Sequence, residues 1–352
     1  MRESILYSTI RSLFIAFAAI IGICLGFFFF FLLFAGLSSK STGDNKLKTV
    51  NSEEIMPNAD NERKVLSSTA PVILQIDING VIGTEDLDTK TIRRQLIESR
   101  EDSYEDDRVK AVLVYINTPG GTVFDADGIY RALKEYKEKY KVPIYSYVDG
   151  LCASGGMYVA SATDEVYASD ISLIGSVGVI APTFMNFTKL LDKLGVDTLT
   201  ISAGKDKDAM NPLRPWKPGE EKNYEDIIKY YYEHFVNIVT SNRPNVSKDK
   251  LVQDYGAQIF NAKDAVDYGF INGINQSIGE TIKKLAKEAN IEDKYQVIKL
   301  ENKNWFSTLF SAENSSLRLL SQCKIKHEIA IGSELPQALH GKFLYYYDPL
   351  SP

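Results

Sequence analysis

An apolar run near the N-terminus constrains this chain more than any other feature of its sequence. Residues Leu13 to Leu37 include no charged side chain, and a helix of that length exceeds the roughly 30 Å hydrocarbon core of a bilayer. The apolar core of a cleaved signal peptide is shorter, about 7 to 15 residues. A buried core helix would rarely be so long at the start of a chain. The run therefore predicts one uncleaved transmembrane helix over residues 13–37.

The charges that flank this run do not orient it, because Arg2 and Arg11 precede it and lysines such as Lys40 follow it. Long domains after a first helix are translocated with little regard to charge. We therefore expect residues 1–12 to be a short cytoplasmic N-terminus and the protein to be a single-pass protein of the cell (inner) membrane, with its main domain on the extracytoplasmic side. Residues 38–70 are rich in polar and charged side chains and predict a linker.

Composition excludes several classes of function. The net charge is −6, with basic residues spread among acidic ones, which does not suggest a nucleic-acid-binding surface. The three cysteines and three histidines have no metal-ligand spacing. We expect no nucleic-acid partner, no disulfide framework, no metal and no cofactor, and a histidine-based catalytic triad is disfavoured.

Strand and helix patterns alternate between residues 71 and 298. Continuous β-branched runs are typical of strands buried on both faces, and charged residues opposite an apolar stripe are typical of covering helices. This order predicts a parallel sheet with right-handed crossovers. The expected strands are Val72–Ile78, Ala111–Ile116, Ile144–Val148, Glu165–Ala168 and Asp197–Ile201, and the expected helices cover residues 89–99, 126–136, 157–162, 189–194, 224–239 and 278–289.

A glycine-rich turn follows the strand predicted at Ile144–Val148. It contains Ala153-Ser154-Gly155-Gly156, after which helical spacing begins. Glycine permits a sharp turn, and the first N–H groups of a helix present a positive dipole end to a developing anion. Such turns are common without any catalytic role, but this position makes Ser154 a candidate nucleophile.

A second glycine-rich loop, Pro119-Gly120-Gly121, follows the strand at Ala111–Ile116. Loops at the carboxyl ends of parallel strands gather at one edge of the sheet, so we expect this loop to meet the Ser154 turn. The N–H groups of Gly120 and Gly155 could then form a two-donor oxyanion hole.

The strand predicted at Asp197–Ile201 leads into a loop that contains Lys205 and Lys207. By the same rule, basic side chains of this loop should reach the edge where Ser154 lies.

Four motifs in this order resemble the signal peptide peptidase A family. They are Asn117–Gly121, Ala153–Gly156, Gly175–Gly178, and Gly204–Asp208 followed by Pro212 and Arg214. The resemblance extends over roughly residues 71–278 and includes the N-terminal anchor. It implies an α/β domain with a parallel sheet and covering helices, similar to the Clp protease proteolytic subunit and the crotonases.

The resemblance also implies an activity: a membrane-anchored serine endopeptidase with a serine–lysine dyad, which degrades cleaved signal peptides and other extended apolar segments. By position in the motifs, Ser154 would be the nucleophile and Lys207 the general base. Gly120 and Gly155 would supply the oxyanion amides, and the Ser176 hydroxyl would orient the lysine.

A lysine serves as base only when it is neutral. Because an exposed lysine has a pKa near 10.4, burial has to lower that value. Lys205 is the alternative base, and Asp206 and Asp208 should point away from Lys207 because a nearby carboxylate favours the charged lysine. The family resemblance implies a homo-oligomeric ring, in which the serine and lysine of one site come from one chain or from neighbouring subunits.

Two other functions are weighed against this one. A crotonase-type acyl-CoA enzyme would share the sheet and the Gly-Gly loop, but it seldom needs a membrane anchor. A catalytically silent membrane scaffold would keep the fold for assembly alone. Residues 299–352 lose the strand–helix alternation and predict a C-terminal tail of unknown role.

Overall fold

A computed structural model describes residues 15, 17–23, 25–27, 30, 52–292, 294–301 and 344–346 of the chain. The chain divides into two units, residues 1–50 and residues 51–352. The described residues of the first unit are helical and exposed. None of the described helices is both long enough and apolar enough to cross a membrane. The span predicted over residues 13–37 lies partly outside the described residues, and the cytoplasmic segment predicted over residues 1–12 lies wholly outside them.

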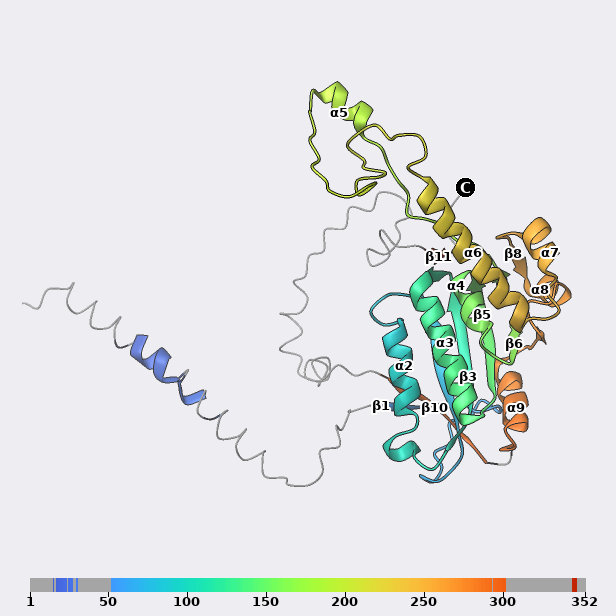
Figure 1. Cartoon of the computed structure of the whole chain (residues 1–352). Helices are drawn as coiled ribbons and strands as arrows, with labels where there is room; N and C mark the ends of the chain where they lie inside the picture. Colours follow the sequence, from blue (N-terminus) through green and yellow to red (C-terminus); the bar gives the residue numbers. More distant parts are fainter. Residues whose placement is uncertain are drawn as a thin grey trace, which may run out of the picture. The chain divides into compact units, whose positions relative to one another are not determined.

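A nine-stranded sheet forms the centre of the second unit, as described (Figure 1). Its strands are β1 (Ser52–Met56), β2 (Val72–Asn79), β3 (Val109–Thr118), β5 (Ile144–Ala153), β6 (Glu165–Ala168), β7 (Leu173–Gly175), β8 (Ile259–Asn261), β9 (Gly273–Ile274) and β10 (Gln296–Glu301). The order is β1-β10-β2-β3-β5-β6-β9, and β7 pairs with both β5 and β8. All pairings are parallel except those of β1 with β10 and of β7 with β8.

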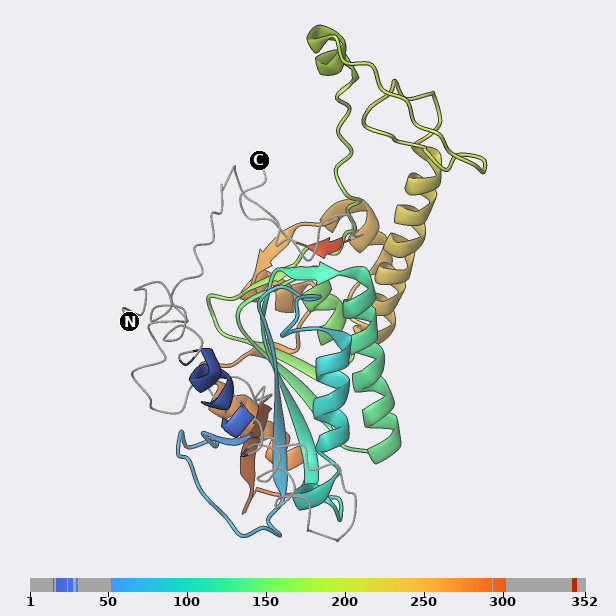
Figure 2. The same cartoon turned by 90° about the vertical axis from the view of Figure 1, so that its left-hand side faces the viewer.

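Helices cover both faces of this sheet (Figures 1 and 2). They include α2 (Thr89–Glu98), α3 (Val123–Tyr140), α4 (Gly155–Ala160), α6 (Lys222–Asn242), α8 (Ala262–Asp267) and α9 (Ile278–Glu288), with a short α7 (Lys248–Lys250) that continues as a π-helical turn over Leu251–Tyr255. Side chains alternate along a strand, so Leu74 and Ile76 join the cluster under α2 and α3, while Ile73 joins the cluster under α9. These observations confirm a mixed α/β fold with a parallel-sheet core.

The strand predicted at Asp197–Ile201 is wrong. These residues pair with no strand, and the side chains of Leu199 and Ile201 are 87% and 88% exposed. They belong to residues 181–221, here named the arm, which contains α5 (Thr188–Leu194) and extends beyond the start of α6 (Figures 1 and 2). β-branched composition favours a strand only where a neighbouring strand and a buried face are available.

The sheet extends past the domain limits expected at residues 71 and 298. Strand β1 lies inside the expected linker and pairs with β10, which itself runs on to Glu301. Inside the expected tail, β11 (Leu344–Tyr346) pairs antiparallel with β4 (Gly120–Thr122). These contacts join segments that are remote in sequence, so local patterns could not reveal them.

We predict that Leu285→Ala lowers the free energy of unfolding by about 2–5 kcal/mol, because Leu285 on α9 is fully buried against the sheet. Urea denaturation of the full chain, followed by circular dichroism, measures the change. The matched control is Ile97→Ala on α2, where the side chain is 59% exposed and the expected loss is below about 0.5 kcal/mol. Equal losses for both variants would contradict the two-faced core.

Candidate active site

The two glycine-rich loops meet, as predicted, at one edge of the sheet. Strands β3 and β5 pair in parallel, and their carboxyl ends lead to β4 and α4. A Cβ atom built on Gly120 would lie 2.7 Å from the backbone nitrogen of Gly155. Only glycine at position 120 allows this approach of the two backbones.

Ser154 lies between β5 and α4 and is 1% exposed. Its φ of 53° is uncommon for a residue with a side chain. The Ser154 N–H donates to the carbonyl of Gly175 at 2.8 Å, and the Ser154 carbonyl accepts from the Tyr158 N–H at 3.1 Å. Its hydroxyl makes no capping hydrogen bond to α4. The backbone is therefore held in a strained conformation of the kind found at functional sites, and the hydroxyl has no capping role.

Ser176 lies beside Ser154, because it follows the Gly175 whose carbonyl holds Ser154. Its own φ is 54°, it is buried, and its N–H donates to the carbonyl of Gln258 at 2.7 Å. Ser176 also lines a mainly apolar groove of about 550 Å³ between its own segment and α6. The groove is further lined by Val177, Gly178, Val179, Ile180, Glu225, Ile228, Lys229, Tyr232 and Ala257.

The two predicted oxyanion amides differ in their bonding. Gly155 is the first residue of α4, so its N–H has no partner within the helix. The N–H of Gly120 donates to Thr118 Oγ1 at 3.0 Å, and that hydroxyl in turn donates to the carbonyl of Gly80 at 2.5 Å. The two glycines lie side by side in space. The Gly120 N–H is bonded to a neighbouring hydroxyl, whereas no such side-chain acceptor is seen for the Gly155 N–H among the described residues.

Strand β11 lies across this edge of the sheet. Tyr345 stands opposite Gly121 in β4, and Leu344 exchanges two backbone hydrogen bonds of 3.1 Å with Ile180. The Tyr345 carbonyl oxygen is so close that a Cβ on Gly120 would lie 2.0 Å from it. An extended segment therefore fits between β4 and Ile180, directly beside Ser154.

The Tyr345 side chain fills an aromatic pocket. Its buried ring stacks on Tyr158 with centroids 5.1 Å apart and packs on Phe235 at 4.5 Å. Its hydroxyl donates to the carbonyl of Tyr231 at 3.0 Å, and burial raises the pKa of Tyr345 well above its ordinary value. Sequence reasoning missed this pocket. The one available signal was Tyr158, a helical turn after Ser154.

The structure does not bring Lys207 to Ser154. Lys207 lies in the arm, where its backbone N–H donates to Gly204, and its side chain is exposed without an ion pair or hydrogen bond to any described residue. Lys205 is exposed in the same turn. The arm extends away from α4 in both views (Figures 1 and 2). Within a single chain, the expectation that the Lys207 loop reaches the sheet edge at Ser154 is wrong, because residues 197–201 before it are not a strand of the sheet.

Two other reactive side chains are poor candidates for the chemistry. The Cys152 thiol is fully buried, and burial raises its pKa to about 12, which makes a thiolate nucleophile unfavourable. His234 on α6 lies 3.8 Å from Asp127, and that carboxylate accepts a hydrogen bond from the Tyr158 hydroxyl at 2.9 Å. Neither residue competes with Ser154.

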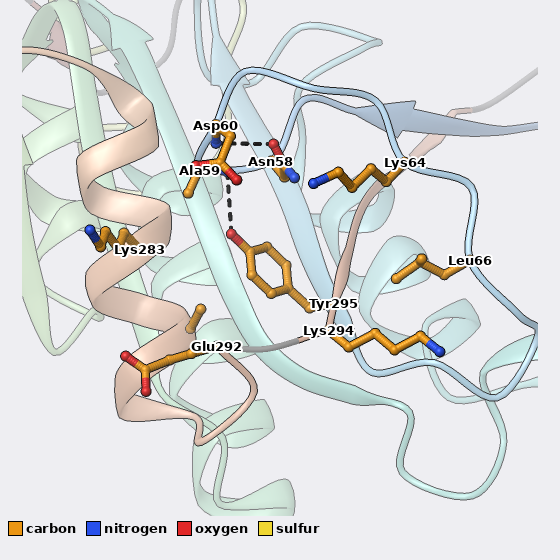
Figure 3. Close-up of a pocket in the computed structure, with 10 residues that line it drawn as sticks. Asn58, Ala59, Asp60, Lys64, Leu66, Lys283, Glu292, Lys294 and Tyr295 are labelled. Atoms are coloured by element: carbon orange, nitrogen blue, oxygen red, sulfur yellow. Dashed lines mark hydrogen bonds between the residues drawn. The ribbon is translucent and has the colours of Figure 1, made fainter.

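A separate pocket of about 210 Å³ lies between α9 and the segment that follows β1 (Figure 3). Its Tyr295 hydroxyl accepts from the Ala59 N–H at 3.2 Å, and Lys64 pairs with Glu62 at 2.8 Å. Tyr295 directly precedes β10, so this pocket lies at the amino ends of the parallel strands, opposite the Ser154 edge. It offers no serine or cysteine nucleophile.

Comparisons with known proteins show which family this chain is similar to. The sequence model of peptidase family S49 matches residues 136–292, and that of Clp protease matches residues 84–172. A provisionally named signal peptide peptidase SppA of Enterococcus faecium is 30% identical over 258 residues, which cover 72% of each chain. Protease 4 of Haemophilus influenzae is 31% identical over 220 residues, which cover 60% of this chain and 33% of the relative. A solved structure of a ClpP1 variant from Listeria monocytogenes aligns with a TM-score of 0.38 and 16% identity, over 60% of this chain and 94% of that chain.

We predict that Gly120→Ala displaces β11, because the added Cβ would overlap the Tyr345 carbonyl at a backbone φ of 97°. Hydrogen exchange at residues 344–346 should rise at least tenfold. Gly80→Ala is the matched control, since its φ of 91° imposes similar backbone strain while its Cβ would meet no atom within 4 Å. An equal rise in exchange in both variants would show that backbone strain, and not the overlap with Tyr345, displaces β11.

Proposed function

Because the chain belongs to peptidase family S49 and is a serine protease, we propose that Ser154 is its nucleophile. The observation that carries this proposal is the conformation of Ser154 itself. Ser154 is buried at the start of α4 with a positive φ and a hydroxyl that caps nothing, and the next residue, Gly155, lies against Gly120 and Gly121 of the neighbouring loop. Family membership argues against both the acyl-CoA enzyme and the silent scaffold.

The chemistry follows from what surrounds Ser154. Its Oγ attacks the scissile carbonyl after a base removes the proton, and the carbonyl oxygen becomes an oxyanion. The Gly155 N–H at the start of α4 donates to that oxygen, and the Gly120 N–H shares its hydrogen between Thr118 Oγ1 and the same oxygen. The positive end of α4 adds to this stabilisation.

We propose Lys207 as the base, delivered by the arm of a neighbouring subunit in a homo-oligomer. Lys207 is exposed, and the arm that contains it extends away from α4 of its own chain. The same arm exposes many large apolar side chains, which suits burial against another copy. They include Met185, Leu190, Leu194, Val196, Leu199 and Ile201. Burial at such an interface disfavours the charged form of a lysine, as a base requires. Ser176 is proposed to orient the lysine, since it lines the groove beside Ser154.

The substrates we propose are signal peptides and other extended apolar segments. An extended segment, β11, pairs with β4 and Ile180 beside Ser154, and the groove under Ser176 is lined by apolar side chains such as Val177 and Ile228. Strand addition supplies affinity through the backbone, while pockets select side chains. Residues 13–37 are proposed as the anchor that places this site at the extracytoplasmic membrane surface.

Ser154→Ala and Lys207→Ala should each lower peptide hydrolysis by about 10³-fold or more, because each removes one member of the reacting pair. Both proteins should keep the thermal stability and oligomeric mass of the wild type. Lys205→Ala is the matched control and should keep most of the activity. An active Lys207→Ala protein beside an inactive Lys205→Ala protein would move the base to Lys205.

Mixing the two inactive proteins tests where the lysine comes from. If neighbouring subunits supply Ser154 and Lys207, co-assembly of Ser154→Ala with Lys207→Ala restores intact pairs in some sites, and hydrolysis returns to a measurable fraction of wild type. Co-expressed, co-purified mixtures should show this return. A mixture as inactive as its parts, despite proven co-assembly, would assign both residues to one chain.

A further inference from the structure

Arg214 is the centre of the loop that carries Lys207. Its Nε donates to Asp208 Oδ2 at 2.8 Å, and its Nη2 donates to the Asp208 carbonyl at 2.8 Å. Its Nη1 forms an ion pair with Glu220 Oε1 at 2.8 Å. The Arg214 and Glu220 side chains are only 22% and 8% exposed, within an arm whose side chains are mostly open to solvent. The guanidinium thus links Asp208 and Glu220 to position 214 of the loop.

Glu220 closes the same loop from its far end. Its second oxygen, Oε2, accepts the Met210 N–H at 3.0 Å, so the pair with Arg214 fixes the end of the turn over residues 205–210, which includes Lys207. Asn211 adds two further bonds, accepting from Trp216 Nε1 at 2.9 Å and donating to Thr200 Oγ1 at 3.1 Å. The backbone after Lys207 is therefore held by side chains that Lys207 itself does not contact.

Asp208 is the residue whose charge this network controls. The Arg214 guanidinium holds the pKa of the Asp208 carboxyl below its usual range, so the group stays ionised. A carboxylate one residue from Lys207 would favour the charged lysine if it were free to approach the ammonium. In the structure Asp208 is turned to Arg214 instead, with Nε and Oδ2 2.8 Å apart.

We propose that Arg214 and Glu220 are positioning residues for Lys207, which fix its turn and hold the Asp208 carboxylate away from its ammonium. This inference rests on the proposed function of Lys207 as the base. The network does not touch the reacting atoms. Its effect is on the fraction of lysine that is neutral at a given pH.

Other charged groups of the arm also contribute to the field at Lys207. Within the loop they are Lys205, Asp206 and Lys217, and among the neighbouring elements they are Lys189, Asp192 and Lys193 on α5, Asp197 after it, and Glu221 and Lys222 at the start of α6. None of them has a hydrogen bond or ion pair with Arg214 or Asp208 among the described contacts. Substitutions at positions 208 and 214 therefore leave these groups in place.

The test is the pH dependence of kcat/KM for four full-length proteins: wild type, Arg214→Ala, Asp208→Asn and the double variant. Activity needs neutral lysine, so the rate rises with pH as the lysine loses its proton. Arg214→Ala frees a carboxylate and should move this rise upward by about 0.5 to 1 pH unit, a three- to tenfold loss on its acid side. Asp208→Asn should move it downward, and the double variant should return close to wild type.

Arg93→Ala is the matched control, because it removes an exposed ion pair with Glu135 on the sheet domain. Its pH profile should be that of the wild type. A uniform loss at every pH in Arg214→Ala, unchanged by adding Asp208→Asn, would overturn the proposal and leave Arg214 a purely structural residue.

Two further variants keep the test decisive. If Arg214→Ala does not fold or assemble, Arg214→Gln serves in its place, since its amide N–H can still donate a hydrogen bond while the positive charge that holds the Asp208 carboxylate is lost. It should move the rise upward, and an unmoved rise would overturn the proposal. Lys207→Ala separates the two levels of argument: activity in that variant would refute the proposed base itself, whereas an inactive Lys207→Ala with an unmoved profile in Arg214→Ala refutes only the role of the network.

Discussion

The parallel pairing of β3 with β5 is the contact on which the candidate site depends. Both strands end at the same edge, so the loop with Gly120 and the turn with Ser154 meet there. The pairing of β7 with β5 then adds Ser176, because the Gly175 carbonyl at the end of β7 accepts the Ser154 N–H. Backbone hydrogen bonds of the sheet hold the three segments together, and the Asn117 and Ser172 side chains add bonds by accepting the N–H groups of Leu151 and Gly150.

Helix α4, which begins beside Ser154, is also held at its C-terminus. The carbonyls near its C-terminus accept hydrogen bonds from the Arg243 guanidinium, at 2.7 Å for Ala160 and 2.9 Å for Thr163. Burial lowers the pKa of Arg243 to about 10, yet the group remains a cation at neutral pH. A positive charge at the negative end of α4 complements the helix dipole, whose positive end faces Ser154. The helix is therefore anchored at both ends, which suits a short element that must hold a strained residue.

Sequence patterns were sufficient wherever neighbouring residues in the chain decide the structure. The strands at residues 72–78 and 144–148 and the turns at Gly120 and Ser154 follow from local periodicity and from glycine chemistry. The position of Lys207 could not be predicted in this way. It was inferred from an expected strand at residues 197–201, and these residues pair with no strand of the sheet. The β11 pairing with β4 was also invisible, since it joins residues more than two hundred positions apart and no periodic pattern marks Leu344–Tyr346.

The position of β11 has a consequence for what this edge can accept. The space between β4 and Ile180 is bounded by main-chain donors and acceptors, and β11 uses them through its own backbone. Contacts of this kind do not distinguish one amino-acid sequence from another, but they do require a chain whose own hydrogen bonds are unmade. A helix or a sheeted domain offers no such chain. A segment that pairs at this edge as β11 does must therefore be extended, and a chain already folded into a helix cannot take the same place.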